Sequence, residues 1–513
     1  MFLKKISSVI KGKTYLHYQV VESYRENGKV KHRNLYSVGV LTEEEAAKLR
    51  LVIAAQSDKE IIVAKIDDMV VTKHLAYLDV AVLHHLWQKW NFDEFFPSDH
   101  WVETMVLNRC LGPLSKIHVK EWAEGTVLPS LTKENILKYD DYDVYRELDK
   151  VYKSETELQS FMHTSLEEKG HSFEQGMFYD ITSSYFEGSK CILARYGYSR
   201  DHRPDCEQIV IALMVTENGY PFYWQVLNGN TADVSTVESM VDHIKQRFGI
   251  KHCTLVFDRG MVSTENLKYI RHNELSYISA LDKDEIKALD IFNDAMPESA
   301  STDNFEQILA MNEFRPVDEN AFLYHREFVK EEHQYIFSFD VARFFEDMKS
   351  MDHRIGQAKE WIIAKNDDLV NSQKSRQLDV VNKEVKKMLA KKQLKKIIEI
   401  EIEPYTATVK NKQGNDREVN TFRIKYVLNL NEELEEQRLN GLTCFISNMP
   451  REHCSAVEII DYYLRKNKVE EAFHENKSYI NLRPIHLSRA ERVKAHVSIC
   501  CCHISYSMIW KYN

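Results

Sequence analysis

The feature that most constrains the fold is an ordered run of strand and helix patterns between residues 176 and 282. GMFYDITSSYF, QIVIALMVT and PFYWQVLNG are three successive strand patterns, and Asn218-Gly219 is a turn signal between the second and third. An amphipathic helix with a Ser235/Glu238 capping box follows, then the buried strand CTLVFD, a helix beginning at Ser263, and the strand SYISAL. This order, β-β-β-α-β-α-β, predicts an α/β fold with a mixed sheet covered by helices.

Bulk composition limits the class of protein. A chain of 513 residues is long enough for several domains, and its net charge of −10 excludes a uniformly basic protein but not local cationic patches. Its nine cysteines include no CxxC pair, which favours a reducing compartment. Neither a signal peptide nor a membrane-spanning pattern is visible, so we expect a soluble cytoplasmic protein with no membrane partner.

The N-terminal region is basic and has a hairpin signal. Asn27-Gly28 lies between two β-rich arms, and eight Lys or Arg against two Glu occupy the first forty residues. Because side chains alternate along a strand, Lys29, Lys31 and Arg33 would form a small cationic ribbon. This ribbon either contacts a DNA backbone or protects an edge strand, and the segment alone favours the second interpretation.

The remaining segments have coarser patterns. Residues from about 43 to 169 are mostly helical, with core positions at Trp87, Trp90, Trp101 and Trp122. Two strand patterns, IIEIEIEPYTATV and TFRIKYVLNL, follow a lysine-rich stretch at 374–396 and indicate an inserted domain. The basic helix there either binds phosphates or is a solvated face. Near the C-terminus, the strand TCFISN precedes a long helix with a Ser455/Glu458 capping box, and an apolar helix covers roughly 491–510.

Two of the predicted strands each carry an aspartate. Asp180 lies within MFYDIT, and Asp258 ends TLVFD ahead of Arg259. An ionised carboxylate is costly to desolvate unless it is paired or binds a metal ion, so each one requires a partner. Taken singly, an aspartate at a strand end is more often a turn former or a helix cap.

The long C-terminal helix adds a polar stripe. At about 100° per residue, Tyr463, Lys466, Glu470 and Lys477 fall at about 0°, 300°, 340° and 320°, whereas Glu471 falls at about 80°. An aromatic side chain, two cations and a carboxylate therefore share one face. A solvated charged helix produces such a stripe as well.

The spacing Y-(2)-K-(3)-E-(6)-K resembles the Y-(2)-R-(3)-E-(6)-K signature of bacterial insertion-sequence DDE transposases of the insertion-sequence-four type. Further similar motifs occur in that family's order: YDITSSYFEG, YGYSRDHRPD, GYPFYWQVLNGNTAD, FDRGMVSTENL and VEEAFHENKSYINLRPIHL. The leading region, including RCLGPLSKIHVKEWAEGT, is also similar. One position differs, because the signature arginine is Lys466, which keeps the charge but lacks the bidentate fork.

The resemblance implies a ribonuclease H-like mixed β-sheet flanked by helices and interrupted by an insertion. It implies that Asp180, Asp258 and Glu470 are the catalytic carboxylates and hold two Mg²⁺ ions about 3.5–4 Å apart, for which Mn²⁺ can substitute. The implied DNA contacts are Tyr463, Lys466, Lys477 and Arg259. The chain then divides into a basic β-hairpin region (1–60), a helical DNA-binding region (61–175), the first part of the catalytic domain (176–282), the insertion (283–440) and the second catalytic part (441–513).

The implied activity is metal-dependent cleavage of double-stranded DNA at the terminal inverted repeats of a transposon, followed by strand transfer into target DNA. The enzyme would work as a dimer on DNA in a bacterial cytoplasm. Two alternatives stay open: a nuclease of the same fold that hydrolyses without joining, and an inactive DNA-binding protein derived from a transposase.

Overall fold

The structure is a computed structural model that describes residues 1–56, 73–97, 100–133, 138, 140, 142–174, 176–186, 190–200, 202–410, 414–466, 485 and 487–512. It divides into two compact units, Met1–Leu75 and Ala76–Asn513, which are described separately. Among the helices of the described ranges, none combines the length and apolar character that a bilayer crossing requires.

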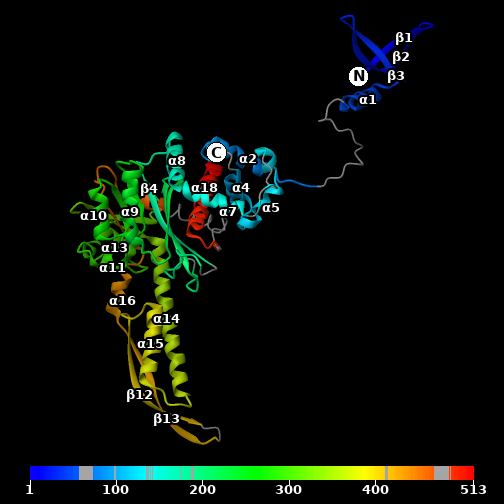
Figure 1. Ribbon diagram of the computed structural model, residues 1–513. Helices are drawn as coiled ribbons and strands as arrows, with labels where there is room; N and C mark the ends of the chain where they lie inside the picture. Colours follow the sequence, from blue (N-terminus) through cyan, green and yellow to red (C-terminus); the bar gives the residue numbers. More distant parts are fainter. Residues whose placement is uncertain are drawn as a thin grey trace. The chain divides into compact units, whose positions relative to one another are not determined.

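The first unit is a three-stranded antiparallel sheet followed by one helix (Figure 1). The strands are β1 (Phe2–Ile10), β2 (Lys13–Glu26) and β3 (Lys29–Gly39), in that spatial order, and the helix is α1 (Glu43–Ala55). Asn27 and Gly28 have φ values of 50° and 76°, so the predicted hairpin turn is confirmed. A capping box between Thr42 and Glu45 begins α1.

The second unit is built on a nine-stranded mixed sheet of order β6-β5-β4-β7-β8-β14-β11-β10-β9. β4 pairs antiparallel with β5, and β5 with β6, whereas β7 and β8 continue from β4 in parallel. Three antiparallel strands continued by two parallel ones form the ribonuclease H-like arrangement, so the expected fold class is confirmed. The strands are β4 (Met177–Tyr185), β5 (Gln208–Thr216), β6 (Pro221–Asn228), β7 (Thr254–Phe257), β8 (Ser276–Ala280), β9 (Arg315–Pro316), β10 (Leu323–Lys330), β11 (His333–Asp340) and β14 (Leu442–Ser447).

Local signals fix most of the helices between these strands. Ser263 accepts a hydrogen bond from the Asn266 amide at 3.1 Å and begins α10 (Thr264–His272), as predicted. The predicted Ser235/Glu238 capping box was wrong. Residues 233–236 form a 3₁₀ turn in which the Ser235 hydroxyl donates back to the Ala232 carbonyl, so α9 (Val237–Asp242) starts one residue later, after Thr236.

A helical layer precedes the sheet in the chain and is joined to it by the last helix. It contains α2 (Leu78–Lys89), α3 (Phe92–Phe95), α4 (His100–Leu111), α5 (Val119–Glu124), α6 (Leu128–Thr132), α7 (Asp143–Lys153) and α8 (Glu155–Glu168). The C-terminal helix α18 (Ala490–Tyr512) contacts α4, α7 and β6. Trp87, Trp90 and Trp101 are buried as predicted, and Trp122 packs half-buried against the same core.

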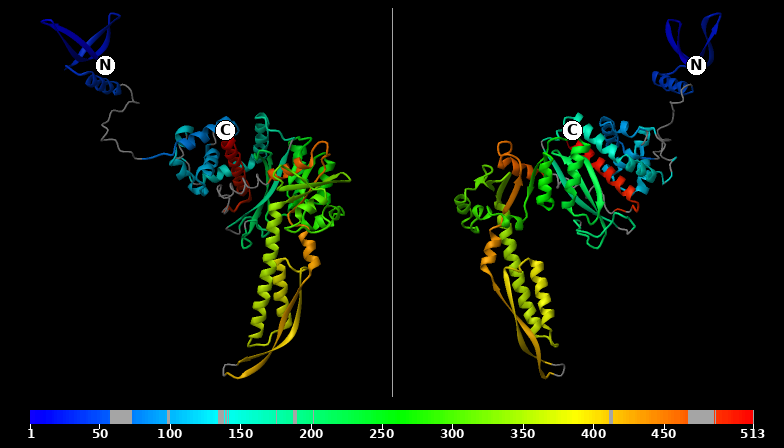
Figure 2. Two further views of the ribbon diagram at one scale, coloured as in Figure 1. Left: turned by 180° about the vertical axis from the view of Figure 1, so that it is seen from behind. Right: turned by 60° about the vertical axis from the view of Figure 1, so that its left-hand side comes forward.

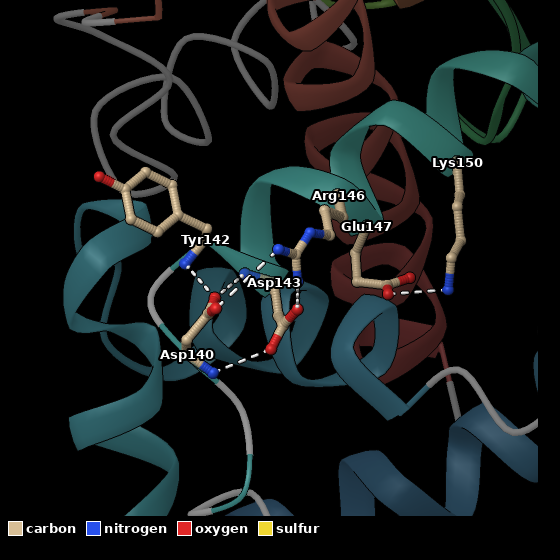
Figure 3. Close-up of polar contacts among 6 residues, drawn as sticks. All are labelled: Asp140, Tyr142, Asp143, Arg146, Glu147 and Lys150. Atoms are coloured by element: carbon tan, nitrogen blue, oxygen red, sulfur yellow. Dashed lines mark hydrogen bonds and ion pairs between the residues drawn. The ribbon is translucent and has the colours of Figure 1, made fainter.

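Charged residues close the first turn of α7 and hold this helix against α18. Asp140 accepts hydrogen bonds from the amides of Tyr142 and Asp143 at 2.8 and 3.0 Å, which closes the first turn of α7 (Figure 3). At the other end of α7, Asp149 receives two hydrogen bonds of 2.9 Å from Arg492 of α18. This paired geometry holds the last helix against the helical layer.

An arm with its own core leaves the sheet after β11. It consists of α14 (Val341–Val370), α15 (Leu378–Lys392), the ribbon β12 (Ile398–Lys410) with β13 (Asp416–Leu428), and α16 (Leu430–Gln437). Figures 1 and 2 show the ribbon running alongside the two long helices. The arm has a separate hydrophobic core, whose buried residues run in the sequence from Met351 to Ile424. Earlier strands of the segment 283–440, β9 to β11, belong instead to the main sheet.

Candidate active site

The pairing of β4 with β7 determines where the two aspartates lie. These parallel strands pair Met177 with Leu255, Phe178 with Val256, and Tyr179 with Phe257. Continued by one residue, the register sets Asp180 beside Asp258, whose φ and ψ of −75° and 154° keep the chain extended. Residues in phase on adjacent parallel strands, about 4.8 Å apart, point to the same face. The two carboxylates therefore lie next to each other on one face of the sheet.

The surroundings of the two carboxylates differ in exposure. Asp180 is half-buried in a strand that is otherwise almost wholly buried, whereas Asp258 is exposed. Residues Tyr179 and Phe257, directly before them, are fully buried on the opposite face. Both faces of β4 and β7 are otherwise buried, so the exposure of Asp258 comes from its place directly after the last residue of β7, where a cation or a substrate can reach it.

Tyr463 contacts Asp258 from the helix that follows β14 in the chain. Its hydroxyl donates a hydrogen bond of 3.4 Å to Asp258 Oδ1, and its ring packs on Phe445 of β14 with centroids 4.9 Å apart. Burial, followed by the charge of Asp258 and this hydrogen bond, raises the pKa of Tyr463 well above its ordinary value. The hydroxyl therefore stays protonated and remains a donor to the carboxylate at neutral pH.

The helix that carries Tyr463 begins at residue 456 and is described to residue 466. The predicted capping box is confirmed, because the Ser455 amide donates to Glu458 Oε2 at 2.8 Å and the Glu458 amide donates to Ser455 Oγ at 3.4 Å. Lys466 is buried, with its ammonium 5.7 Å from the centre of the Tyr463 ring. Glu470 and Lys477 lie outside the described residues.

Arg465, next to Lys466, points elsewhere. It forms ion pairs with Glu217 and, at 2.7 Å, with Asp461. The helical phase that separates positions 465 and 466 therefore holds in the structure, and the cation on the Tyr463 side is Lys466.

A cleft of about 330 Å³ adjoins Asp258 and Tyr463. Three cations line it: Arg259 in the turn after β7, Lys283 at the start of α11 (Lys283–Ala288), and Arg343 in the first turn of α14. Arg343 donates to Thr443 Oγ1 at 2.8 Å, which fixes it at the rim. Only Arg259 was predicted from the sequence. The available signal for the other two was that each follows shortly after a strand end.

A second ion pair lies close to the aspartates and was also missed. Asp233 pairs with Arg200, and a Cβ atom added to Gly260 would lie 3.4 Å from Asp233 Oδ2, so Asp233 borders the turn that follows Asp258. The Arg200 amide donates to Ser183 Oγ of β4 at 3.0 Å. This pair therefore contacts both elements that carry the aspartates. Its sequence signals were the motifs YGYSRDHRPD and LNGNTAD.

In the part of the chain that the structure describes, no three His, Cys, Asp or Glu side chains form a group that could hold a metal ion. Two of the three predicted carboxylates, Asp180 and Asp258, are described and come together. The third, Glu470, belongs to the range that is not described.

Two models of known protein families match the chain. A family model described as the transposase DDE domain matches residues 171–505, which is more than half of the chain. The chain belongs to the DDE transposase family. A second model, the N-terminal domain of IS1634 family transposases, matches residues 3–63, which include the three strands and the helix of the first unit. The expected insertion-sequence transposase is thereby confirmed as an enzyme that cleaves DNA and transfers its strands, whereas the Y-R-E-K signature stays a prediction.

Solved transposase structures are only distantly similar. The piggyBac transposase synaptic complex with hairpin DNA is 10% identical with a TM-score of 0.38, over 90% of this chain and 70% of that chain. The Mos1 transposase paired-end complex with left transposon end is 10% identical with a TM-score of 0.16, over 46% of this chain and 67% of that chain. None of the curated proteins compared with the chain matches it.

Proposed function

We propose that this transposase cuts DNA at the terminal inverted repeats of its own mobile element and joins the freed ends to target DNA, with Asp180, Asp258 and Glu470 as catalytic carboxylates. The observation that carries the proposal is the register of β4 and β7, two inner strands of a buried sheet, which sets two carboxylates side by side where β7 ends. Adjacent carboxylates repel each other unless a cation lies between them. The Tyr463 hydroxyl satisfies only one oxygen of Asp258.

The donor set suits a hard divalent cation. Asp180 and Asp258 offer carboxylate oxygens, which Mg²⁺ prefers, and Glu470 would complete the set from the helix. When bound, two Mg²⁺ or Mn²⁺ ions supply activation of the attacking oxygen and stabilisation of the leaving one. The chain's own residues hold these ions, and Tyr463 orients Asp258 by donating to it.

The cleft cations would hold the DNA strand beside the aspartates. Arg259, Lys283 and Arg343 line one continuous cleft with Asp258, so phosphates on either side of the scissile bond can meet a guanidinium or an ammonium. Lys466, which is buried beside the Tyr463 ring, would act on the same strand through Tyr463, and Lys477, which lies outside the described residues, would bind a phosphate from the helix face that the sequence predicts. In cleavage, water oxygen attacks phosphorus and the 3′ oxygen leaves as a hydroxyl. In joining, the oxygen of that hydroxyl attacks a target phosphorus, the bond from this phosphorus to the target strand's own 3′ oxygen breaks, and that oxygen leaves as a hydroxyl after taking up the proton that the attacking hydroxyl loses.

The proposed function also implies how many chains act together and how the parts of each chain are divided. Two ends must be processed together, so we expect a dimer on DNA, acting in the bacterial cytoplasm. We retain the five-part division of the chain. Within the insertion, residues 341–437 form the arm, and β9 to β11 extend the catalytic sheet.

The test is a single-turnover assay on duplexes that contain the inverted repeats flanking this reading frame. The full chain is expected to cleave them and to form joined products only with Mg²⁺ or Mn²⁺. Asp180→Asn, Asp258→Asn and Glu470→Gln should each lower the rate by roughly 10³-fold while DNA affinity is kept. Glu471→Gln is the matched control, because it changes the neighbouring carboxylate off the stripe.

Each alternative has its own outcome in this assay. Full activity in Asp180→Asn or Glu470→Gln would show that the site is assigned wrongly. Cleavage without joined products would identify a nuclease, and end-specific binding without cleavage would identify a DNA-binding protein.

A further inference from the structure

The sheet of the first unit has two faces with different chemistry. α1 covers one of them, where Leu3 and Tyr18 pack on Ala46 and Ile53 of the helix. Lys5 lies on the same side, because it forms a 2.5 Å ion pair with Glu43 of α1. Side chains alternate along a strand, so the pairing register assigns the remaining residues to the covered face or to the opposite one, which we call the open face.

The open face carries cations and neutral polar groups beside apolar side chains, among them the exposed Phe2, Ile10 and Val30 and the buried Val21. Lys4 of β1 and Lys13 and Arg25 of β2 have the opposite phase to Lys5 and Tyr18, and so lie on it. Gln19 and His17 of β2 share this phase, and Asn34 of β3 joins them through its pairing with Val21. A ring contact at 5.2 Å between Phe2 and His32, from the two outer strands, supports the assignment, because both residues belong to this face by register.

The carboxylates of the sheet all lie on the other face. Residues 1–39 are fully described, and their two carboxylates, Glu22 and Glu26, share the phase of Tyr18. There Glu22 pairs with Arg33 at 2.6 Å, and Glu26 pairs with Lys31. The predicted ribbon of Lys29, Lys31 and Arg33 does project from one face, but glutamates neutralise two of its three charges. Lys4, Lys13 and Arg25 pair with no described carboxylate.

We propose that the open face binds double-stranded DNA by lying in its major groove. The axes of the first and third strands lie about 10 Å apart, a separation comparable to the width of the major groove, which is about 12 Å and admits β-strands. A face with three unpaired cations and no carboxylate complements the phosphates at the groove walls. Glutamine and asparagine side chains, as at positions 19 and 34, can each make two hydrogen bonds to an adenine edge.

This inference rests on the proposed function for the identity of the partner, but it adds a recognition surface that takes no part in cleavage. The phosphate contacts would position the first unit, and the amide and imidazole side chains would read sequence. A second copy of the chain or an acidic protein surface are the other occupants that such a face could take, and both predict no dependence on DNA sequence.

The experiment compares two triple variants of the full chain. Lys4→Gln, Lys13→Gln and Arg25→Gln together remove the charges of the open face, and Lys29→Gln, Lys31→Gln and Arg33→Gln together remove the same number from the covered face. Binding to labelled duplexes of the element's ends, and to a scrambled duplex, is measured across a salt series. Protection of guanine N7 from dimethyl sulfate reports occupancy of the major groove.

The open-face triple should weaken binding to the ends by at least about 10-fold and reduce the salt slope by about 2–3, with loss of a block of N7 protection. The covered-face triple should change the slope by less than about 1. His17→Ala with Gln19→Ala should lose preference for the ends over the scrambled duplex while retaining affinity for the latter. Thermal melting identifies any variant that misfolds, and Arg25→Gln alone, near the exposed hairpin end, then decides the outcome.

Unchanged affinity and N7 protection in the open-face triple would overturn this inference, as would an equal loss in the covered-face triple. If the wild-type chain cleaves the ends while the open-face triple binds them normally, this inference fails and the proposed function stands. If the wild-type chain neither binds nor cleaves any duplex, both fail.

Discussion

In the catalytic sheet, β4, β5 and β7 bury almost every side chain, whereas most side chains of β1 to β3 in the first unit are exposed. The buried sheet brings Asp180 and Asp258 to one point at the end of a short parallel register. The exposed sheet spreads Lys4, Lys13 and Arg25 along one face. The alternation of side chains along strands therefore has a different result in each sheet. In the catalytic sheet it brings two carboxylates together, and in the first unit it spreads cations along a face that suits a long polyanion.

Replacing the Asp258 carboxylate by a thiol should have the largest effect on the rate of cleavage. Asp258→Cys is expected to lower Mg²⁺-dependent cleavage by roughly 10³-fold, because a thiolate is a poor ligand for Mg²⁺. Mn²⁺ accepts sulfur more readily and should restore part of the rate. Single-turnover cleavage in each metal checks this, with Asp284→Cys on exposed α11 as the control. Equal loss in both metals, with folding intact, would argue that Asp258 is not a ligand.

Removing an aromatic ring from each sheet should separate their stabilities. Phe257→Ala, at a fully buried position directly before Asp258, is expected to cost about 3–5 kcal/mol in the free energy of unfolding. Phe2→Ala, at a position 39% exposed on the open face, should cost less than about 1 kcal/mol. Urea denaturation of the full chain measures both. A cost for Phe2 that matched Phe257 would mean that the open face is covered in the free protein.

The hydrogen bond to Asp258 should matter less than the carboxylate itself. Tyr463→Phe keeps the ring against Phe445 and removes only the donor at 3.4 Å, so cleavage should slow by about 10-fold or less. Tyr462→Phe is the matched control, since that half-buried residue faces Arg465. A loss as large as that of Asp258→Asn would instead assign the Tyr463 hydroxyl to the reaction itself.

The smallest expected effects concern the pH dependence of stability. One glutamate from each unit should change the stability with opposite sign as pH rises. Burial raises the pKa of Glu155 despite hydrogen bonds from Trp224 Nε1 and Ser498 Oγ, so its contribution to stability is present at low pH and is lost as pH rises through the folded value. The hydrogen bond from Lys5 lowers the pKa of Glu43, so its contribution is present above the ordinary value and is lost as pH falls.

Melting temperatures across about pH 3 to pH 7, a range that extends below the ordinary pKa of a glutamate, check this contrast. Glu155→Gln should gain stability over the wild type as pH rises, and Glu43→Gln should lose it. Parallel curves for the two variants would contradict the burial argument for Glu155.

Local signals explain what the sequence predicted well. Neighbouring residues determine the Asn27-Gly28 turn and the Ser263 and Ser455 caps. They also determine where the strands β4 to β8 occur along the chain. The helix start predicted at Ser235 failed because a 3₁₀ turn uses that serine differently. In the first unit, the glutamates and the predicted ribbon share one face, a fact that depends on the pairing register and not on any local signal.

Non-local pairing explains what the sequence missed at the site. Lys283 and Arg343 reach the cleft of Asp258 because β14 pairs with both β8 and β11, which joins segments far apart in the chain. Neither cation lies in a motif, so no spacing pointed to it. The two aspartates were predictable because each ends or interrupts an apolar strand, and their adjacency followed once β4 and β7 were paired.

The central claim is that Asp180 and Asp258 hold a cation together. Mn²⁺ binding to the full chain on end DNA, followed by electron paramagnetic resonance, tests it without relying on turnover. We predict that Asp180→Asn and Asp258→Asn each weaken Mn²⁺ binding by at least about 10-fold, as expected when one charged ligand is lost, and that Asp284→Asn does not. Wild-type Mn²⁺ affinity in either of the first two variants would contradict the account.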